Sequence, residues 1–237
     1  MIWRSTLTIL LLALASCSQQ PPGDHIPESA NLPFERWYVG MFAPDYMEVW
    51  VEQIDVTDRQ GFTYYNVHGG VPAINTPPDN KGDPTGWPDR VSSGKTMPMI
   101  NMDLPTEISL SWQSLAEPQA YQVTLAIPSW VHDDMLAPRG AYCAWRDAHV
   151  TQHRDIISIG LAPGGIAKAW LVGPCLPAIE ITRVQGKVRE LGPYNGTSNG
   201  EFYRPPSPNA PTLYRHPRHT IWQLVSALSP SCPGAGP

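Results

Sequence analysis

The pattern most suggestive of catalysis is Gly-Thr-Ser-Asn-Gly at residues 196–200, which matches the G-x-S-x-G nucleophile elbow of hydrolases. In such an elbow a buried strand precedes the serine and a helix follows it, so that a strained turn exposes the hydroxyl. Here a Gly-Pro pair precedes the pattern, and Pro205 and Pro206 follow it, where they would end a helix. The context therefore predicts a surface loop around Ser198 rather than a nucleophile.

Two histidines, His149 and His153, are four residues apart, a spacing that would place both on one helix face as half of a zinc site. The segment between them lacks the glutamate of H-E-x-x-H, so we interpret them as solvated surface histidines. Residues 93–96 (Ser-Gly-Lys-Thr) supply only half of a phosphate-binding loop, because Asp89 occupies the position of its first glycine. We predict no catalytic residue, no metal site and no cofactor.

Cys17, the first cysteine, is a candidate site of lipid modification. Residues 7–14 form an uncharged, largely apolar run behind the single positive charge of Arg4, too short for the ~20 residues of a spanning helix, so they indicate a secretory signal. The run ends in Leu-Ala-Ser-Cys, which resembles the lipobox of bacterial lipoproteins. This resemblance implies cleavage after residue 16 and diacylation of Cys17. We expect residues 1–16 to be the signal peptide and residues 17–35 a flexible, lipidated tether.

The lipid would be the chain's attachment to the cell envelope. Two or more acyl chains make a stable anchor, whereas one is marginal. Ser18, rather than aspartate, follows the modified cysteine, and by resemblance to the sorting rule of enteric bacteria this favours the outer membrane over the inner one. We expect a periplasm-facing protein held to the membrane through its lipid alone.

Export would place the three remaining cysteines, Cys143, Cys175 and Cys232, in a compartment where disulfides form. Three cysteines allow three single pairings, each with one thiol left over. Cys232 lies in the Pro- and Ser-rich segment 229–237, which we expect to be a disordered tail. We therefore predict that Cys143 pairs with Cys175.

The composition indicates a packed, β-rich body that has no electrostatic footprint for nucleic acid. The chain has 27 Pro and 19 Gly, which shorten helices, while nine Trp and nine Tyr favour strands and a hydrophobic core. The formal net charge of −5 excludes the basic surface that a nucleic-acid or anionic-lipid partner requires.

Alternation of apolar and polar residues predicts the strands of this body. In residues 46–56 the odd positions from 47 to 51 are apolar, while positions 48, 50 and 52 are Glu, Trp and Glu. Further strands are predicted over residues 37–42, 62–67, 107–112, 121–127, 156–161, 166–172 and 179–188. A Pro-Gly-Gly spacer between two of them predicts a hairpin turn.

The sequence predicts little other regular secondary structure. Residues 129–136 predict a short helix with Ser129 as its N-cap and acidic residues in its first turns, and residues 221–225 a last ordered piece. Residues 68–98 predict a long surface loop, and the chain is again rich in Pro and Gly after residue 192. These features favour a single mainly β domain over residues 36–228, an antiparallel β-sandwich or barrel-like sheet with long Pro/Gly-rich loops and little helix.

Four segments carry a resemblance to a known family. They read WQSLAEPQAY at 112–121, GLAPGG at 160–165, WLVGPCL at 170–176 and GPY at 192–194. From about residue 37 to residue 222 the chain resembles a family of proteobacterial lipoproteins known only as a domain of unknown function. Some relatives of this type are encoded beside type VI secretion effectors, including phospholipases, and are understood as periplasmic immunity proteins. The resemblance assigns no catalytic residue.

The leading hypothesis is thus an immunity lipoprotein that binds and sterically blocks an envelope-targeting effector, with no enzymatic activity of its own. Its loops at 68–98 or 193–210 would face the effector, and Trp87, Tyr194 and Tyr203 would contribute much of the binding energy. One alternative is a structural or assembly lipoprotein of the envelope. A less favoured one is an envelope hydrolase that uses His149, His153 or Ser198.

Overall fold

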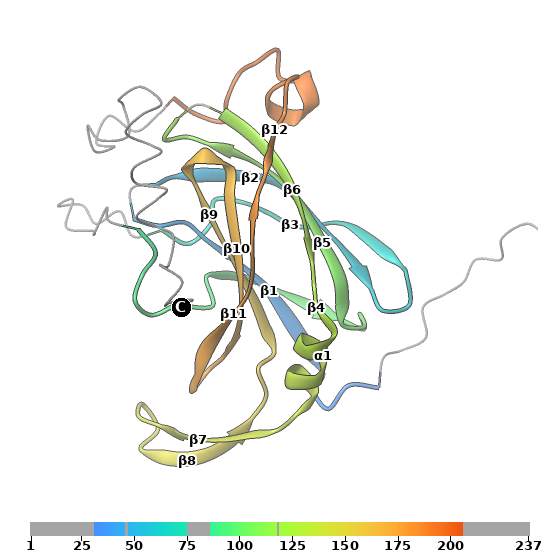
Figure 1. Cartoon of the computed structure of the whole chain (residues 1–237), viewed down its shortest axis with the longest axis vertical. Coiled ribbons are helices and arrows are strands. Elements are labelled where there is room, and N and C mark those ends of the chain that lie inside the picture. Colours follow the sequence, from blue (N-terminus) through green and yellow to red (C-terminus); the bar gives the residue numbers. More distant parts are fainter. Residues whose placement is uncertain (1–30, 46, 75–85, 118, 206–237) are drawn as a thin grey trace, which may run out of the picture.

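The computed structural model describes residues 31–45, 47–74, 86–117 and 119–205. The predicted signal peptide, Cys17, Cys232, the ordered piece at 221–225 and the tail at 229–237 lie outside these residues. Within them the chain forms two five-stranded sheets that face each other, together with one α-helix and a separate two-stranded hairpin (Figure 1). Each sheet keeps its own edge strands, so the architecture is a mainly β sandwich rather than a closed barrel, and the predicted fold class is confirmed.

Sheet A has the order β11-β10-β9-β1-β4 and sheet B the order β12-β6-β5-β2-β3. The strands of sheet A are β1 (Arg36–Phe42), β4 (Lys95–Ile100), β9 (Ile156–Ala162), β10 (Ile166–Gly173) and β11 (Leu176–Gln185). Those of sheet B are β2 (Val49–Asp58), β3 (Thr63–Gly70), β5 (Pro105–Ser114), β6 (Gln119–Ala126) and β12 (Lys187–Val188). Neighbouring strands are antiparallel except β1 and β9, which pair in parallel.

The hydrophobic core lies between the two sheets, where the apolar positions of each strand meet. The inward side chains of β1 are Trp37, Val39 and Met41, as period-two alternation predicts. On β2 the inward positions change from odd (49 and 51) to even (54 and 56) numbers. A register shift against β5 between residues 51 and 53 explains this change, because a β-bulge adds one residue to one strand and reverses the faces beyond it.

Residues 86–93 form a third layer over the outer face of sheet A. Trp87 packs against Phe42 and Trp170, with ring centroids 5.8 and 5.3 Å away, and the Ser158 hydroxyl donates to the Ser92 carbonyl at 2.9 Å. The layer needs room, and Gly160 provides it. A Cβ on Gly160 would lie 2.4 Å from Cζ3 of Trp87.

We expect Gly160→Ala to lower the free energy of unfolding by about 1–3 kcal/mol, the usual cost of overpacking a filled site. Urea denaturation measures this loss. Gly140→Ala is the matched control, since Gly140 also lies in a strand and its added Cβ would meet no atom within 4 Å. Equal stability of the two variants would contradict the close packing of Trp87 on Gly160.

Two predicted segments differ from the structure. The two ends of the predicted loop 68–98 are strands, because residues 68–70 belong to β3 and residues 95–98 to β4. Pro98 is tolerated because β4 is an edge strand among the described residues. The predicted strand 179–188 is divided between the sheets, as β11 in sheet A and β12 in sheet B. The chain crosses at Gly186, whose N–H donates to the Gly165 carbonyl at 2.7 Å, and a Cβ on Gly186 would lie 2.7 Å from the Trp112 ring.

The predicted short helix is present as α1 (Ser129–Leu136), but its cap is not the predicted one. Pro128 is the N-cap residue, Ser129 is already helical, and no side chain caps the first turn. The first turn has no acidic residue, because Asp133 and Asp134 come one turn later. No described helix has the length and apolar character needed to span a membrane.

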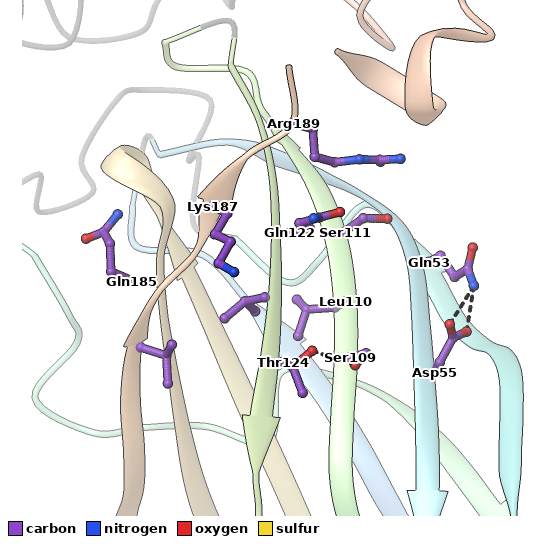
Figure 2. Close-up of a pocket in the computed structure, with 12 residues that line it drawn as sticks. Gln53, Asp55, Ser109, Leu110, Ser111, Gln122, Thr124, Gln185, Lys187 and Arg189 are labelled. Atoms are coloured by element: carbon purple, nitrogen blue, oxygen red, sulfur yellow. Dashed lines mark hydrogen bonds between the residues drawn. The ribbon is translucent and has the colours of Figure 1, made fainter. Parts of the chain in front are cut away.

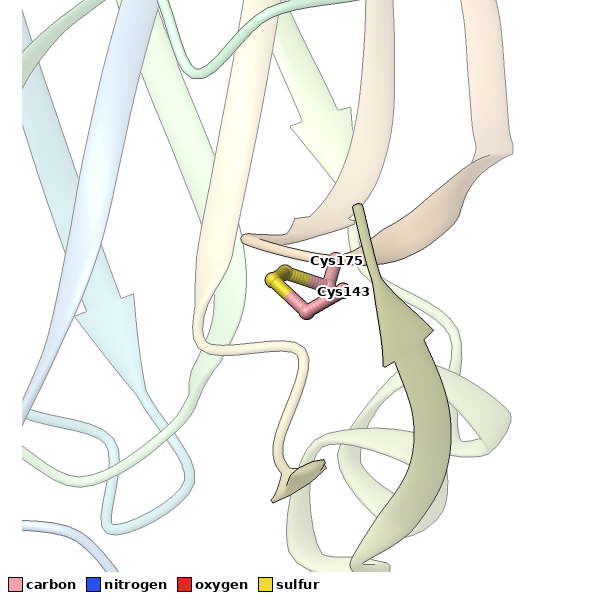
Figure 3. The surroundings of a disulfide bond; sticks show 2 residues. All are labelled: Cys143 and Cys175. Atoms are coloured by element: carbon pink, nitrogen blue, oxygen red, sulfur yellow. A yellow bond between two sulfur atoms is a disulfide. The ribbon is translucent and has the colours of Figure 1, made fainter. Parts of the chain in front are cut away.

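After α1 the chain forms a hairpin that belongs to neither sheet, β7 (Arg139–Cys143) and β8 (Ala148–Gln152). Burial alternates along both strands, with Ala141 and Val150 paired on the less exposed face, but the strands are short and carry few large apolar residues, so the sequence pattern did not predict them. A disulfide joins Cys143, the last residue of β7, to Cys175 in the turn between β10 and β11, with a Cα–Cα distance of 5.1 Å (Figure 3). The predicted pairing is confirmed.

Candidate functional site

Three aromatic side chains come together on the outer face of sheet B, where β2 begins. Trp50 projects from β2, and the ring of Tyr203 stacks on it with a centroid distance of 3.5 Å and an interplanar angle of 9°. The Trp50 indole N–H donates to the Tyr194 hydroxyl at 2.6 Å. Tyr194 and Tyr203 are 39% and 49% exposed, so the cluster offers an aromatic surface to solvent. We call these three residues the aromatic platform.

A buried carboxylate holds this platform against the sheet. Glu52, whose side chain is 3% exposed, forms an ion pair with Arg189, whose side chain is 11% exposed. Its Oε1 also accepts hydrogen bonds from the Tyr194 backbone N–H at 2.8 Å and from Gln113 Nε2 at 3.0 Å. Gln113 Oε1 in turn accepts the Tyr203 backbone N–H at 2.7 Å. Both tyrosines are therefore fixed through their backbones by two coupled polar side chains.

The segment that carries the two tyrosines has an unusual backbone. Tyr194, Asn195 and Asn199 all have positive φ angles, 50°, 55° and 54°, in the left-handed region that non-glycine residues seldom occupy. Tyr194 lies in the 3₁₀ turn η2 (Pro193–Gly196), and its conformation directs its N–H to Glu52. Such strain persists only where the surroundings enforce it, and it is concentrated at functional sites. At Tyr194 the hydrogen bond to Glu52 contributes to that enforcement.

Beside the platform, the outer face of sheet B forms a polar groove of about 580 Å³. Cross-strand rows of outward side chains make its floor, because Gln53, Ser111, Gln122 and Lys187 occupy paired positions on four strands. The next row places Asp55 beside Ser109 and Thr124. Figure 2 shows these side chains projecting from adjacent strands, with Gln185 of β11 on one side.

The groove is suited to hydrogen bonding. Asp55 accepts both from Gln53 Nε2 and from the backbone N–H of Asn66, each at 2.7 Å, and the hydroxyls of Ser109 and Thr124 lie 2.9 Å apart. Amides, hydroxyls and single charges on a rigid sheet can pair with the polar backbone and side chains of a protein segment. Together, the aromatic platform and the polar groove place three aromatic side chains beside a hydrogen-bonding surface.

The predicted partner-binding residues lie on opposite faces of the sandwich. Tyr194 and Tyr203 meet in the platform, whereas Trp87 is partly buried in the layer over sheet A. Lys168 of β10 lies on the face of sheet A beneath that layer, paired with Glu180 at 2.7 Å and 4.9 Å from the Trp170 ring centroid. Of the predicted loops, the parts at 75–85 and 206–210 lie outside the described residues.

Sequence reasoning missed four members of the site, Trp50, Glu52, Gln113 and Arg189. Trp50 and Glu52 were placed on the polar face of their strand, and a tryptophan on such a face is itself a signal of an exposed aromatic site. Arg189 offers no local pattern. It reaches Glu52 across 137 residues of sequence, which only the paired sheet brings together.

The residues of the hydrolase alternative are not brought together. Ser198 follows η2 near one end of the molecule, where its hydroxyl donates to the Pro193 carbonyl at 3.2 Å. His149 lies on β8 in the hairpin at the other end (Figure 1). His153 has its Nδ1 2.9 Å from the Met135 carbonyl. No strand leads into Ser198 and no helix follows it within the described chain, which agrees with the predicted loop.

Among the described residues, no three His, Cys, Asp or Glu side chains are grouped closely enough to hold a metal ion. His132, which precedes two aspartates in the sequence, is buried, and its Nε2 lies 2.7 Å from the Pro105 carbonyl. It therefore has a structural partner in the first residue of β5.

Segments 112–121 and 160–165, two of the four that carry the family resemblance, meet at the turns between strands. Glu117 in the β5–β6 turn accepts the Gly164 N–H at 2.6 Å and the Tyr121 hydroxyl at 2.9 Å. Gly164 belongs to η1 (Pro163–Gly165), the predicted hairpin turn between β9 and β10. Burial raises the pKa of Glu117, and burial beside this carboxyl raises the pKa of Tyr121. This contact joins sheet A to sheet B.

Comparison with known proteins places this arrangement in one family. No curated protein and no solved structure matches the chain. The family described as "Protein of unknown function (DUF2931)" matches residues 19–215, a range that includes both sheets, the aromatic platform and all four resembling segments. The chain therefore belongs to this family of unknown function.

Proposed function

We propose that this protein is an envelope lipoprotein of a bacterium and that it binds and neutralises a toxic effector delivered by type VI secretion. Its lipidated Cys17 holds the domain at the membrane, facing the periplasm. The effector is a protein, a lipase or another enzyme that attacks the envelope. The observation that carries the proposal is the aromatic platform, fixed on a rigid sheet by the buried Glu52 carboxylate.

The platform has the properties of a binding hot spot. Trp and Tyr are enriched among the few residues that dominate binding energies, because they bury a large area at a small cost in side-chain entropy. Trp50 and the two tyrosines are held before the partner arrives, so little conformational freedom remains to be lost on binding. The polar groove adjoins them and supplies the surrounding hydrogen bonds.

Neutralisation by this surface is steric. The strands of the domain are hydrogen-bonded into two sheets that pack face to face, so the binding surface is rigid. A loop or cleft of the effector that docks on the platform is therefore covered by the domain. No chemistry by the immunity protein is required. The protein works by occupying the access route to the effector's active site.

We expect Trp50→Ala to weaken binding of the effector encoded next to this gene by about 30-fold, which corresponds to the ~2 kcal/mol of a hot-spot residue. Isothermal titration calorimetry with the purified effector measures the change. In cells, the variant should restore sensitivity to that effector when it replaces the wild-type gene. Tyr65→Ala is the control, because Tyr65 is 75% exposed and lies on β3, outside the platform and groove.

Three results would contradict the proposal. The first is unchanged sensitivity to the neighbouring effector after deletion of the gene. The second is equal binding by the Trp50→Ala and Tyr65→Ala proteins. In the third, a pull-down recovers envelope assembly machinery in place of a toxin, which would support the structural lipoprotein alternative.

A further inference from the structure

Exposed aromatic side chains also gather at the end of the molecule opposite to the platform. Trp145, 67% exposed, lies in the turn of the β7–β8 hairpin, Tyr142 on β7 is 53% exposed, and Trp130 on α1 is 39% exposed. Figure 1 shows β7, β8 and α1 at the lower end, and the orange segment after β12 at the upper end. We call Trp130, Tyr142 and Trp145 the hairpin aromatics.

Polar groups accompany these rings. The Arg146 guanidinium lies 4.4 Å from the Trp145 ring centroid, and the Tyr142 hydroxyl donates to Asp147. Residues 130–154 contain three Arg and three Asp, with no Lys or Glu, so their formal charges balance. Trp and Tyr with polar neighbours are typical of segments at the boundary between a membrane and water, where an apolar ring body and a polar edge are both accommodated.

The hairpin aromatics are held outward by a rigid support. The Cys143–Cys175 disulfide ties the hairpin to sheet A. At its other end, the Asp134 carboxylate pairs with Arg154 at 2.8 Å and with Arg139. These covalent and ionic links keep the hairpin in place, so its exposed rings do not fold back onto the core.

The described chain begins at this same end. The Phe34 ring lies 5.4 Å from the ring of His153, directly after β8, and β1 starts beside it at Arg36. Residue 31 is 14 residues after Cys17, a separation that spans at most about 50 Å. The sheets are shorter than this, because the ten residues of β5 extend about 33 Å. The tether alone would therefore let either end of the domain face the bilayer.

We propose that the hairpin aromatics form a lipid contact surface that inserts at the membrane–water boundary and orients the domain. This inference rests on the lipidation of Cys17, which is part of the proposed function. The lipid supplies the attachment and the rings supply the orientation, with the aromatic platform turned away from the membrane. Because the local charges balance, the contact does not depend on anionic lipid.

The test uses the full chain, expressed with its signal sequence and reconstituted into phosphatidylcholine vesicles whose acyl chains carry bromine, which quenches nearby tryptophan. We expect partial quenching of the wild-type fluorescence, and loss of more than half of that quenching in Trp145→Ala. Trp50→Ala is the matched control at the opposite end and should retain the quenching. Circular dichroism and the thermal midpoint verify that both variants are folded.

Absence of quenching in the wild-type protein, or equal quenching in wild type and Trp145→Ala, overturns the inference. So does a change of oligomeric state in Trp145→Ala, measured by sedimentation, without a change in quenching, because the hairpin would then be a protein interface. Effector binding separates this inference from the proposed function. Trp145→Ala should bind the effector normally while Trp50→Ala does not.

Discussion

Replacing Cys143 and Cys175 together by serine is expected to lower the free energy of unfolding by about 2–4 kcal/mol. The two cysteines are 32 residues apart, so the bond closes a loop of intermediate length and removes much of its conformational freedom from the unfolded chain. The hairpin that it holds has no place in either sheet. Urea denaturation of the oxidised wild-type protein and the double variant measures the difference.

A cysteine outside the disulfide provides the control for this experiment. Cys232→Ser should leave the free energy of unfolding unchanged, and treatment with a reductant should lower the stability of the wild type but not of the double variant. A double variant as stable as the oxidised wild type would contradict a structural role for the bond. We also expect proteolysis to begin within residues 139–152 in the double variant, because the hairpin has lost its covalent link to sheet A.

The second large effect is expected from Glu52→Ala, which should cost about 3–5 kcal/mol, the usual penalty for breaking a buried ion pair. The change leaves Arg189 as an unpaired charge that is only 11% exposed, and it removes the acceptor of the Tyr194 backbone N–H. The platform then loses its support, so effector binding should fall together with stability. Chemical denaturation and calorimetric titration of one preparation measure both.

Two further variants test whether the loss comes from the unpaired buried charge. Glu35→Gln breaks an exposed pair with Arg36 and should cost less than about 1 kcal/mol, since solvent screens such pairs. The double variant Glu52→Gln/Arg189→Met should lose less stability than the sum of its single changes, because no buried charge is left unpaired. Additive losses would show that the ion pair does not couple the two residues.

These variants distinguish two contributions of the site. Glu52 supports the platform from beneath, whereas the partly exposed Trp50 is a member of the platform itself, stacked on Tyr203 and hydrogen-bonded to Tyr194. Trp50→Ala should therefore weaken binding with little loss of stability, while Glu52→Ala weakens both. Support of this kind keeps Tyr194 and Tyr203 in place on the outer face of sheet B although they are 39% and 49% exposed.

Local patterns in the sequence predicted a large part of the fold. Period-two alternation located β2, β5 and β6, because a strand with one buried face repeats every two residues whatever its partner. β9 and β10 are buried on both faces, and β-type runs separated by turn residues predicted them instead. The Pro-Gly-Gly turn at η1 and the pairing of Cys143 with Cys175 were also predicted correctly. The motif around Ser198 was correctly interpreted as a loop, because the prolines beside it exclude the required strand and helix.

The tertiary structure decided which of these segments meet. Pro98 indicated a loop from sequence, whereas the structure places it in β4 at a sheet edge. The predicted strand 179–188 is divided at Gly186 into two strands that belong to different sheets. Trp50 and Tyr194, 144 residues apart, form one hydrogen bond. Sequence periodicity reports only whether a side chain faces the core. The partner of an outward side chain is set by sheet order and register, which depend on contacts between distant parts of the chain.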